Sequence, residues 1–222
     1  GESGKKNLII DVRENEGGYP KNEMLLTSYL ATTPFREMKN ARVTTLSIPA
    51  KEHLDRKEFP QGIIRYVEKH LVSDFEKTAA GTYQIKEEKN PVRKPRSSAF
   101  KGNLYVLISG MTHSGASSLC SLLREYPNVT FLGEETGGCS AAFTAGNLLV
   151  YNLPHSWCQL VVPVIRYETN LIDSKYPAHR GIIPDHPVEQ TQEDLLDGTD
   201  SILQLTLELI QKLSISPKQP SK

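Results

Sequence analysis

The sequence has no long apolar run, no excess of either charge and few cysteines, and each shortage excludes a class of protein. No apolar stretch approaches the roughly 18 residues that a membrane-spanning helix needs. Lys and Arg total 26 and Asp and Glu total 26, so no strong positive charge favours binding to nucleic acid. Cys120, Cys139 and Cys158 are odd in number and unclustered, which indicates neither a disulfide framework nor a zinc site. We therefore expect a soluble globular protein with free thiols.

The first residues also lack two features of a complete secreted precursor. GESGKK runs directly into the strand-like NLIIDVR, without a starting Met and without the apolar centre of a signal peptide. We therefore expect that part of a longer parent protein precedes Gly1, and the family resemblance given below implies that this part includes an upstream subdomain.

The length of 222 residues suits a single α/β domain, and the first half alternates between strand and helix patterns. Residues 7–13 form a continuous apolar run that predicts a buried strand, and residues 22–32 have helix-like spacing. The pattern then predicts a strand at 43–49 and an amphipathic helix at 61–77. Residues 78–100 lose this periodicity, so we expect a surface excursion there.

The second half repeats the alternation and indicates the fold class. Strands are predicted at 103–109 and 129–134 with a helix between them that ends near Tyr126, which makes a parallel βαβ unit. Residues 147–154 and 158–168 read as extended, and Thr191 is a predicted N-cap for a final helix whose core stripe is Leu203, Leu207 and Ile210. Residues 214–222 are expected to form a flexible tail. The expected fold is a largely parallel sheet with helices on its faces.

The turn in LISGMTHSGASSLCSLL, residues 107–123, is unusually rich in hydroxyl groups. A hydroxyl between a strand and a helix lies at the carboxyl edge of a parallel sheet, where ligands bind and free helix N–H groups point at anions. Ser114 could therefore be a nucleophile, with the N–H of Gly115 as an oxyanion-hole donor. The alternative is that Thr112 or Ser114 only caps the helix. A phosphate-binding loop is disfavoured because the Gly-Lys-Ser/Thr ending is absent.

Five stretches together resemble the tail-specific, or C-terminal processing, serine protease family, which includes the tricorn core protease and the interphotoreceptor retinoid-binding protein repeats. They follow one another in the family's order and cover most of the chain outside the excursion. They are LIIDVRENEGG at 8–18, NLYVLISGMTHSGASSL at 103–119, LGEETGG at 132–138, LPHSWCQLVVPVIRY at 153–167, and the segment 181–210. The resemblance implies a ClpP/crotonase-like core and peptide-bond hydrolysis.

The resemblance also implies a set of site residues. Ser114 becomes the nucleophile, and the oxyanion hole combines the Gly115 N–H with a backbone N–H from the Gly17–Gly18 turn. Glycines suit this work because a residue without Cβ lets the backbone approach a tetrahedral intermediate. The family resemblance places further residues at the border of the substrate cleft: Glu134, Glu135, Thr136, Gly137 and His155.

The general base is where this sequence departs from the family pattern. Bacterial processing members have a lysine shortly after the Thr-Gly segment, but Cys139 follows it here. The tricorn-like branch takes a histidine from sequence upstream of the first strand, so we expect the base to lie outside this chain, which alone would be nearly inactive. His113 adjoins Ser114, so the two side chains should diverge. His179 and His186 flank GIIPD, in which Asp185 is either near the base or part of a structural turn.

Two other functions stay open. The retinoid-binding relatives imply that the chain could be a noncatalytic module that binds a ligand or peptide. A crotonase-like acyl-CoA enzyme would share the layout without a serine nucleophile. For the peptidase, we expect no cofactor or metal, a peptide or unfolded protein as substrate, and an upstream PDZ-like domain in the parent chain. The family resemblance suggests a periplasmic, envelope or secreted location.

Overall fold

The computed structural model describes residues 4–145, 148–156, 158–173 and 179–215. Contacts within the chain group it into two units, each assembled from separate segments. Unit 1 contains residues 1–35, 94–140 and 179–222, and unit 2 contains residues 36–93 and 141–178. The chain passes from one unit to the other after residues 35, 93, 140 and 178. This grouping by contacts does not decide whether the chain is one domain, so the single domain stays a prediction.

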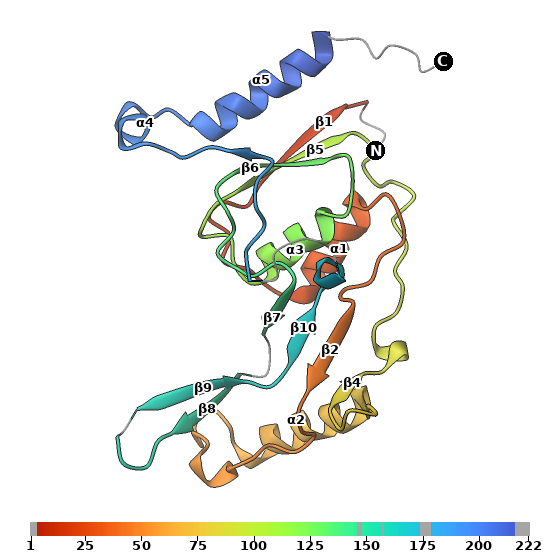
Figure 1. The fold of residues 1–222 in the computed structure, drawn as a ribbon, viewed down its shortest axis with the longest axis vertical. Helices are drawn as coiled ribbons and strands as arrows, with labels where there is room; N and C mark the ends of the chain where they lie inside the picture. Colours follow the sequence, from red (N-terminus) through yellow and green to blue (C-terminus); the bar gives the residue numbers. More distant parts are fainter. Residues whose placement is uncertain (1–3, 146–147, 157, 174–178, 216–222) are drawn as a thin grey trace. The chain divides into compact units, whose positions relative to one another are not determined.

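Unit 1 is built on a parallel sheet with the order β1-β5-β6-β11. Its strands are β1 (Asn7–Asp11), β5 (Asn103–Ile108), β6 (Val129–Gly133) and β11 (His186–Pro187). Its helices are α1 (Pro20–Leu30), α3 (Gly115–Leu123), α4 (Gln192–Asp197) and α5 (Ser201–Ile215). In Figure 1, α1 and α3 lie on one face of this sheet and α5 lies on the other. The predicted fold class is therefore confirmed.

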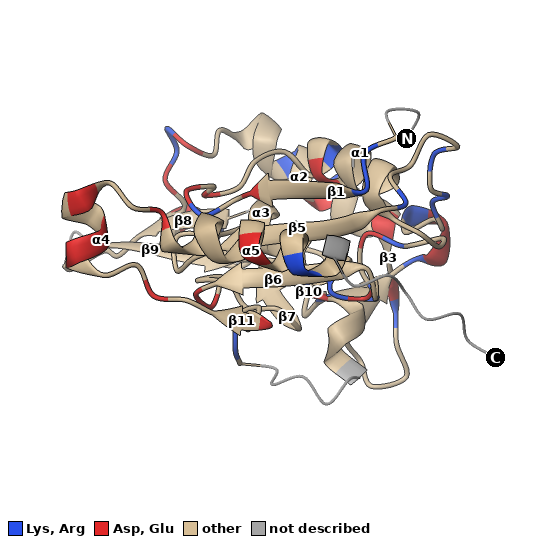
Figure 2. Cartoon of the chain, turned by 90° about the horizontal axis from the view of Figure 1, so that it is seen from above, with Lys and Arg blue, Asp and Glu red and all other residues tan. Residues whose placement is uncertain are grey.

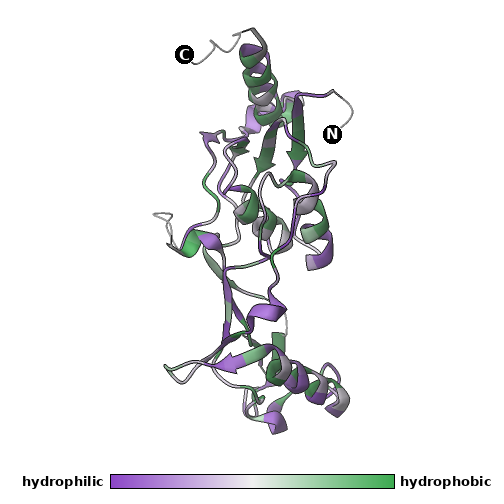
Figure 3. Cartoon of the chain, turned by 90° about the vertical axis from the view of Figure 1, so that its right-hand side faces the viewer, coloured by the Kyte–Doolittle hydropathy of each residue, from purple (hydrophilic) through white to green (hydrophobic). Residues whose placement is uncertain are grey.

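The central strand explains why both faces are covered. Every residue of β5 after Asn103 is buried, so its alternating side chains need apolar partners on both sides. Tyr105 and Leu107 pack with Leu132 of β6 against Ile202 of α5. The hydrophobic strands appear green in Figure 3. This packing fixes the carboxyl edge of the sheet, where the β5–α3 turn begins.

The C-terminal helical region confirms one prediction and corrects another. Thr191 is the N-cap of α4, and its Oγ1 accepts a hydrogen bond from the Asp194 N–H at 3.1 Å in a full capping box. The predicted single helix is instead two, because Gly198 ends α4 in the left-handed conformation with φ 68°. The predicted core residue Leu207 is 46% exposed, whereas Ile202, at 3%, is the buried contact. The predicted residues Leu203 and Ile210 do pack against the cluster that contains Ile202, so the predicted stripe is wrong only at Leu207.

Unit 2 has a five-stranded antiparallel sheet with the order β3-β4-β2-β10-β7 and a separate β8-β9 hairpin. Its strands are β2 (Asn40–Val43), β3 (Phe75–Lys77), β4 (Tyr83–Ile85), β7 (Ala142–Thr144), β8 (Leu148–Asn152), β9 (Gln159–Pro163) and β10 (Arg166–Glu168). Its helices are α2 (Gln61–Asp74) and the short η1 (Lys51–His53), η2 (Glu87–Lys89) and η3 (Asn170–Asp173).

Three sequence expectations shift in unit 2. The strand expected at 43–49 is β2 at Asn40–Val43, and the extended run 158–168 divides into β9 and β10. The segment 78–100 is not wholly irregular, since β4 pairs with both β2 and β3. Such short strands carry too few residues for a clear alternation of polar and apolar side chains.

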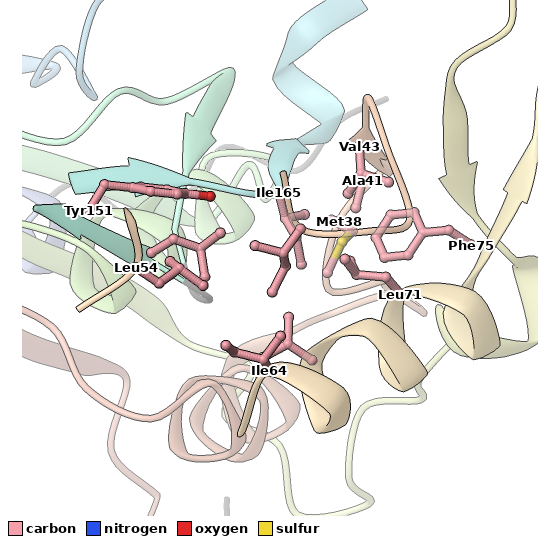
Figure 4. Packing of buried hydrophobic residues seen from close by; sticks show 12 residues of the cluster. Met38, Ala41, Val43, Leu54, Ile64, Leu71, Phe75, Tyr151 and Ile165 are labelled. Carbon is pink, nitrogen blue, oxygen red and sulfur yellow. The ribbon is translucent and has the colours of Figure 1, made fainter. Parts of the chain in front are cut away.

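The core of unit 2 lies between α2 and the strands. Figure 4 shows Ile64 and Leu71 of α2 pointing toward Met38, Phe75 and other apolar side chains of the same cluster. Ile63, the neighbour of Ile64 in α2, is instead 43% exposed. No described helix is long and apolar enough to cross a membrane.

Candidate active site

The β1–α1 loop and the β5–α3 turn of unit 1 are joined by several hydrogen bonds. The buried Thr112 Oγ1 donates to the carbonyl oxygen of Val12 at 2.9 Å and accepts from the Ser109 N–H at 3.0 Å. Ser109 Oγ donates to the carbonyl oxygen of Arg13 at 2.6 Å. The His113 N–H donates to the carbonyl oxygen of Asn15 at 3.1 Å. These bonds hold the two loops side by side at the carboxyl edge of the sheet.

The hydroxyl groups of the turn fall into two classes. Thr112 is bonded as above, Ser117 Oγ donates to the Thr112 carbonyl oxygen at 2.6 Å, and Ser118 Oγ donates to Glu23 Oε1 at 2.5 Å. Ser114 is exposed, and its Oγ has no hydrogen-bond partner among residues 4–145, 148–156, 158–173 and 179–215. Three hydroxyls therefore hold the local structure, and one is available for chemistry.

Ser114 also has an unusual backbone. It is the N-cap of α3 by position, with φ 50° and ψ −125°, but its side chain makes no capping hydrogen bond. L-residues rarely adopt this region, and such conformations cost about 1–3 kcal/mol. This backbone conformation leaves the side chain exposed at a sharp strand-to-helix turn, as in a nucleophile elbow. The capping interpretation of Ser114 therefore lacks its defining hydrogen bond.

Glycines allow the backbone to approach Ser114 closely. Gly17 has φ 118°, and a Cβ built on it would lie 2.6 Å from Ser114 Cβ and 3.0 Å from the Gly115 nitrogen. A Cβ built on Gly115 would lie 3.3 Å from both the nitrogen and the oxygen of Gly18. The Gly17–Gly18 turn and the start of α3 are thus in direct backbone contact.

Two backbone N–H groups beside Ser114 are available to an oxyanion. The Gly17 N–H is occupied, because it donates to Asn15 Oδ1 at 2.8 Å. The N–H groups of Gly18 and Gly115 have no acceptor in the part of the chain that the structure describes. Gly115 is also the first residue of α3, where the helix dipole favours negative charge. Of the two glycines in the turn, Gly18 is therefore the better donor candidate.

The segment Glu135–Gly138 borders the same turn. A Cβ on Gly137 would lie 2.3 Å from Cε1 of the His113 ring, and the Gly138 N–H points to the Thr112 carbonyl oxygen at 3.4 Å. The buried Thr136 holds the segment in place, since its N–H donates to the Ile182 carbonyl oxygen at 3.2 Å. It also accepts from the Ile182 N–H at 2.8 Å through Oγ1.

The two carboxylates of this segment have different surroundings. Glu135 pairs with Arg180 and accepts from the Gly181 N–H at 2.7 Å. The Arg180 hydrogen bonds hold the pKa of Glu135 below its ordinary value. The exposed Glu134 instead lines an open groove of about 1130 Å³ with Asp11, Arg13 and Asp200. Glu14 and Glu16 of the β1–α1 loop also line that groove, as does Asp194 of α4, a helix that is partly red in Figure 2.

The remaining predicted residues include a histidine of unit 2 and an aspartate of unit 1. His155 is in the exposed turn between β8 and β9 of unit 2, and its place at the substrate cleft stays a prediction. Asp185 binds Arg124 Nη1 at 2.7 Å and accepts from the Phe131 N–H at 2.8 Å, as a structural turn would. Among the described residues, no histidine forms a hydrogen bond with Ser114. No cluster of His, Cys, Asp or Glu within the described ranges could hold a metal ion.

Two residues of the site were missed in the sequence. Asn15 orients the Gly17 turn, and Glu23 of α1 reaches Ser118 in the first turns of α3. A polar residue before the Gly-Gly pair was a usable clue for Asn15. Glu23 had none, because its contact with α3 is made across 95 residues of sequence.

Most of the chain matches one known protein family. Residues 1–188 match the family model described as Peptidase family S41. A comparison with curated protein sequences gave no match.

Three solved structures share the fold. Mature CPAF aligns with a TM-score of 0.56 at 16% identity, covering 95% of this chain and 45% of CPAF. A candidate peptidase from Parabacteroides merdae ATCC 43184 aligns with a TM-score of 0.53 at 20% identity, covering 92% of this chain and 51% of that one. A candidate S41 protease from Bacteroides fragilis NCTC 9343 gives 0.51 at 15% identity, covering 94% and 45%.

The chain spans about half the length of these proteins. Because these structures are at most 20% identical to the chain, they show only that the fold is shared. The family model matches residues 1–188, most of the chain, and therefore shows the family. The family resemblance of the five sequence stretches is thereby confirmed, and the chain belongs to peptidase family S41.

Proposed function

We propose that the protein is a serine endopeptidase of the tail-specific type, with Ser114 as its nucleophile. The observation that carries the proposal is the contrast within one turn. Ser114 Oγ is exposed, held in a strained conformation and without a partner among the described residues, while Thr112, Ser117 and Ser118 are all bonded. Strain of this kind is retained where it serves a function.

The proposed reaction is acyl transfer to Ser114. Oγ attacks the carbonyl carbon of the peptide bond while its proton passes to a general base. The oxyanion accepts hydrogen bonds from the Gly115 and Gly18 N–H groups. The base then gives its proton to the leaving amine, and water, activated by the same base, hydrolyses the acyl-enzyme. One oxyanion donor contributes about 10²–10³-fold to the rate in serine proteases.

We propose that the base is a histidine outside residues 1–222. The support is that no described histidine bonds to Ser114, and that the solved relatives are about twice as long as this chain. His113 is a poor candidate, because its ring lies against Gly137. On this proposal, residues 1–222 alone hydrolyse peptides far more slowly than the full-length protein.

Peptide hydrolysis by the full-length protein tests the proposal. We expect Ser114→Ala to lower kcat/KM by at least about 10³-fold. Its melting temperature should stay the same, since Oγ supports no other described group. Ser47→Ala, an exposed serine of unit 2, is the matched control and should keep full activity. Wild-type activity in Ser114→Ala would refute the assignment. If the folded wild-type protein hydrolysed no peptide, a noncatalytic peptide-binding module would be favoured instead.

The substrate class and location follow from the same proposal. A peptidase takes peptides or unfolded proteins as substrates, and a PDZ-like domain elsewhere in the full-length protein would help to select them. We propose a periplasmic, envelope or secreted location. Fractionation of cells that express the full-length protein tests this, and recovery in the cytoplasmic fraction alone would contradict it.

A further inference from the structure

A small cavity opens beside the two candidate oxyanion donors. It has a volume of about 210 Å³, and its lining includes Gly18, Gly115, Leu26, Ala116 and Leu119. This is below the roughly 300–1,000 Å³ of sites for whole small molecules, so it suits a single side chain. A substrate residue whose carbonyl oxygen reaches Gly18 and Gly115 has its own side chain within reach of this cavity.

The cavity has an apolar wall and one charge. Glu23 is the only charged residue among the described residues that line it. Ser118 Oγ donates to Glu23 Oε1 at 2.5 Å, which fixes the carboxylate. The other oxygen, Oε2, lies 3.7 Å from the position of a Cβ on Gly115. Glu23 also lies in the first turn of α1, where the helix dipole stabilises its charged form.

We propose that this cavity receives the side chain of the substrate residue that supplies the scissile carbonyl, and that Glu23 makes the enzyme prefer lysine or arginine there. The inference rests on the proposed serine peptidase function. The methylene groups of either side chain would pack on Leu26, Ala116 and Leu119. The cationic end would then meet the Glu23 carboxylate in a charge-assisted hydrogen bond.

The position of Glu23 means that the preference for lysine or arginine affects the rate of the chemical step. A carboxylate close to Gly115 repels the negative charge that develops on the oxyanion, so substrates with a neutral side chain react more slowly. A lysine or arginine in the cavity neutralises Glu23 and removes that repulsion. Glu23 thus changes the rate of the chemical step as well as binding. The larger groove lined by Asp11 and Asp200 does not have this property, because neither Gly18 nor Gly115 lines it.

The test uses two peptidyl diphenyl phosphonates that differ only in the side chain next to phosphorus, aminobutyl as in lysine or butyl as in norleucine. In each, an Oγ–P bond to Ser114 forms, the P–O bond to one phenoxy group breaks, and the phenol leaves with the serine proton. With the full-length protein, we expect the lysine-type probe to label at least about 10-fold faster.

Two variants separate a specificity role from a structural one. In Glu23→Gln we expect the ratio of the two rates to fall to about 1, with the lysine-type probe slower and the butyl probe faster than in wild type. Asn22→Lys places a cation at the rim of the same cavity and should lower the ratio at least about threefold without removing any bond of Glu23. A simple loss of structure would slow both probes together.

A small, uncharged fluorophosphonate that does not fill the cavity distinguishes failure of this inference from failure of the proposed function. If it labels Ser114 while the wild-type ratio is near 1, or while Glu23→Gln and Asn22→Lys keep the wild-type ratio, the preference is refuted and the peptidase assignment stands. If no probe labels Ser114 in folded protein, both are refuted.

Discussion

Each unit contains one described residue other than glycine with a positive φ, and the two differ in kind. Ala50 in unit 2 has φ 46° and ψ 45°, an ordinary left-handed conformation at the start of η1. Ser114 in unit 1 has φ 50° and ψ −125°, a region that is costly for any L-residue. Ala50 serves a turn, whereas Ser114 keeps its strain next to two available N–H groups. We therefore propose that a reactive position is recognised by its dihedral angles together with its hydrogen-bond partners, and not by a positive φ alone.

The two units should also respond separately to cavities in their cores. Leu132 of unit 1 and Leu71 of unit 2 are both fully buried, and substituting either by alanine should cost about 3 kcal/mol of unfolding free energy. Hydrogen exchange should show faster exchange mainly in the unit that carries the substitution. Equal loss of protection in both units would contradict the division.

The close approach of Gly17 should be needed for activity. In Gly17→Ala, the new Cβ would lie 2.6 Å from Ser114 Cβ at a φ of 118°, so the turn must move. We expect kcat/KM for a peptide to fall by about 10²-fold, because small displacements of reacting groups have effects of this size. Gly110→Ala is the control, since its Cβ has no neighbour within 4 Å, and it should retain activity within about threefold. Equal losses in both variants would show that the contact is not specific.

The sequence identified the strand–turn–helix pattern, the nucleophile candidate and the parallel βαβ unit, because each depends on neighbouring residues. It could not show that Thr112, Ser117 and Ser118 are bonded while Ser114 has no described partner, since these bonds reach Val12 and Glu23 in distant segments. It also missed β4, whose three residues are too few to show alternation. Local patterns predict helices and strands, whereas contacts between distant segments decide which hydroxyl groups of a turn have hydrogen-bond partners.

The backbone strain at Ser114 should be measurable as a change in the free energy of unfolding when the residue is replaced by glycine. Ser114→Gly removes strain of about 1–3 kcal/mol but adds unfolded-state entropy, so we expect a net gain of about 1 kcal/mol. Ala50→Gly starts from a less strained conformation and should change stability by less than about 0.5 kcal/mol. Denaturant unfolding of both variants measures the difference. A destabilised Ser114→Gly protein would mean that the Ser114 conformation is not strained.

The smallest expected effect concerns the attachment of α5 to the sheet edge. Arg13 donates to both carboxylate oxygens of Asp200 at 2.9 and 2.7 Å, and these bonds lower the pKa of Asp200 from 3.8. A carboxyl group whose pKa is lower in the folded protein adds stability at pH values above its pKa in the unfolded chain. That stability is lost as the pH falls through the pKa of the folded protein. Asp200→Asn should therefore cost about 0.7 kcal/mol near pH 7, after discounting for solvent screening, and nothing well below pH 3.8.

Denaturant unfolding from pH 7 to pH 2 measures this difference. Asp197→Asn is the control, because Asp197 is exposed and forms no ion pair with another described residue. A cost of Asp200→Asn that does not change with pH would contradict the role of the Arg13–Asp200 pair.

We propose that the Ser114 hydroxyl is the reactive one in residues 107–123 and that the hydroxyls of Thr112, Ser117 and Ser118 are structural. The most direct test is to treat the folded full-length protein with a small fluorophosphonate and to locate the adduct by mass spectrometry within residues 107–123. We predict a single adduct on Ser114, with Thr112, Ser117 and Ser118 unmodified as internal controls, and no adduct in Ser114→Ala. No adduct on Ser114, or an adduct on Ser117 or Ser118 that persists in Ser114→Ala, would contradict it.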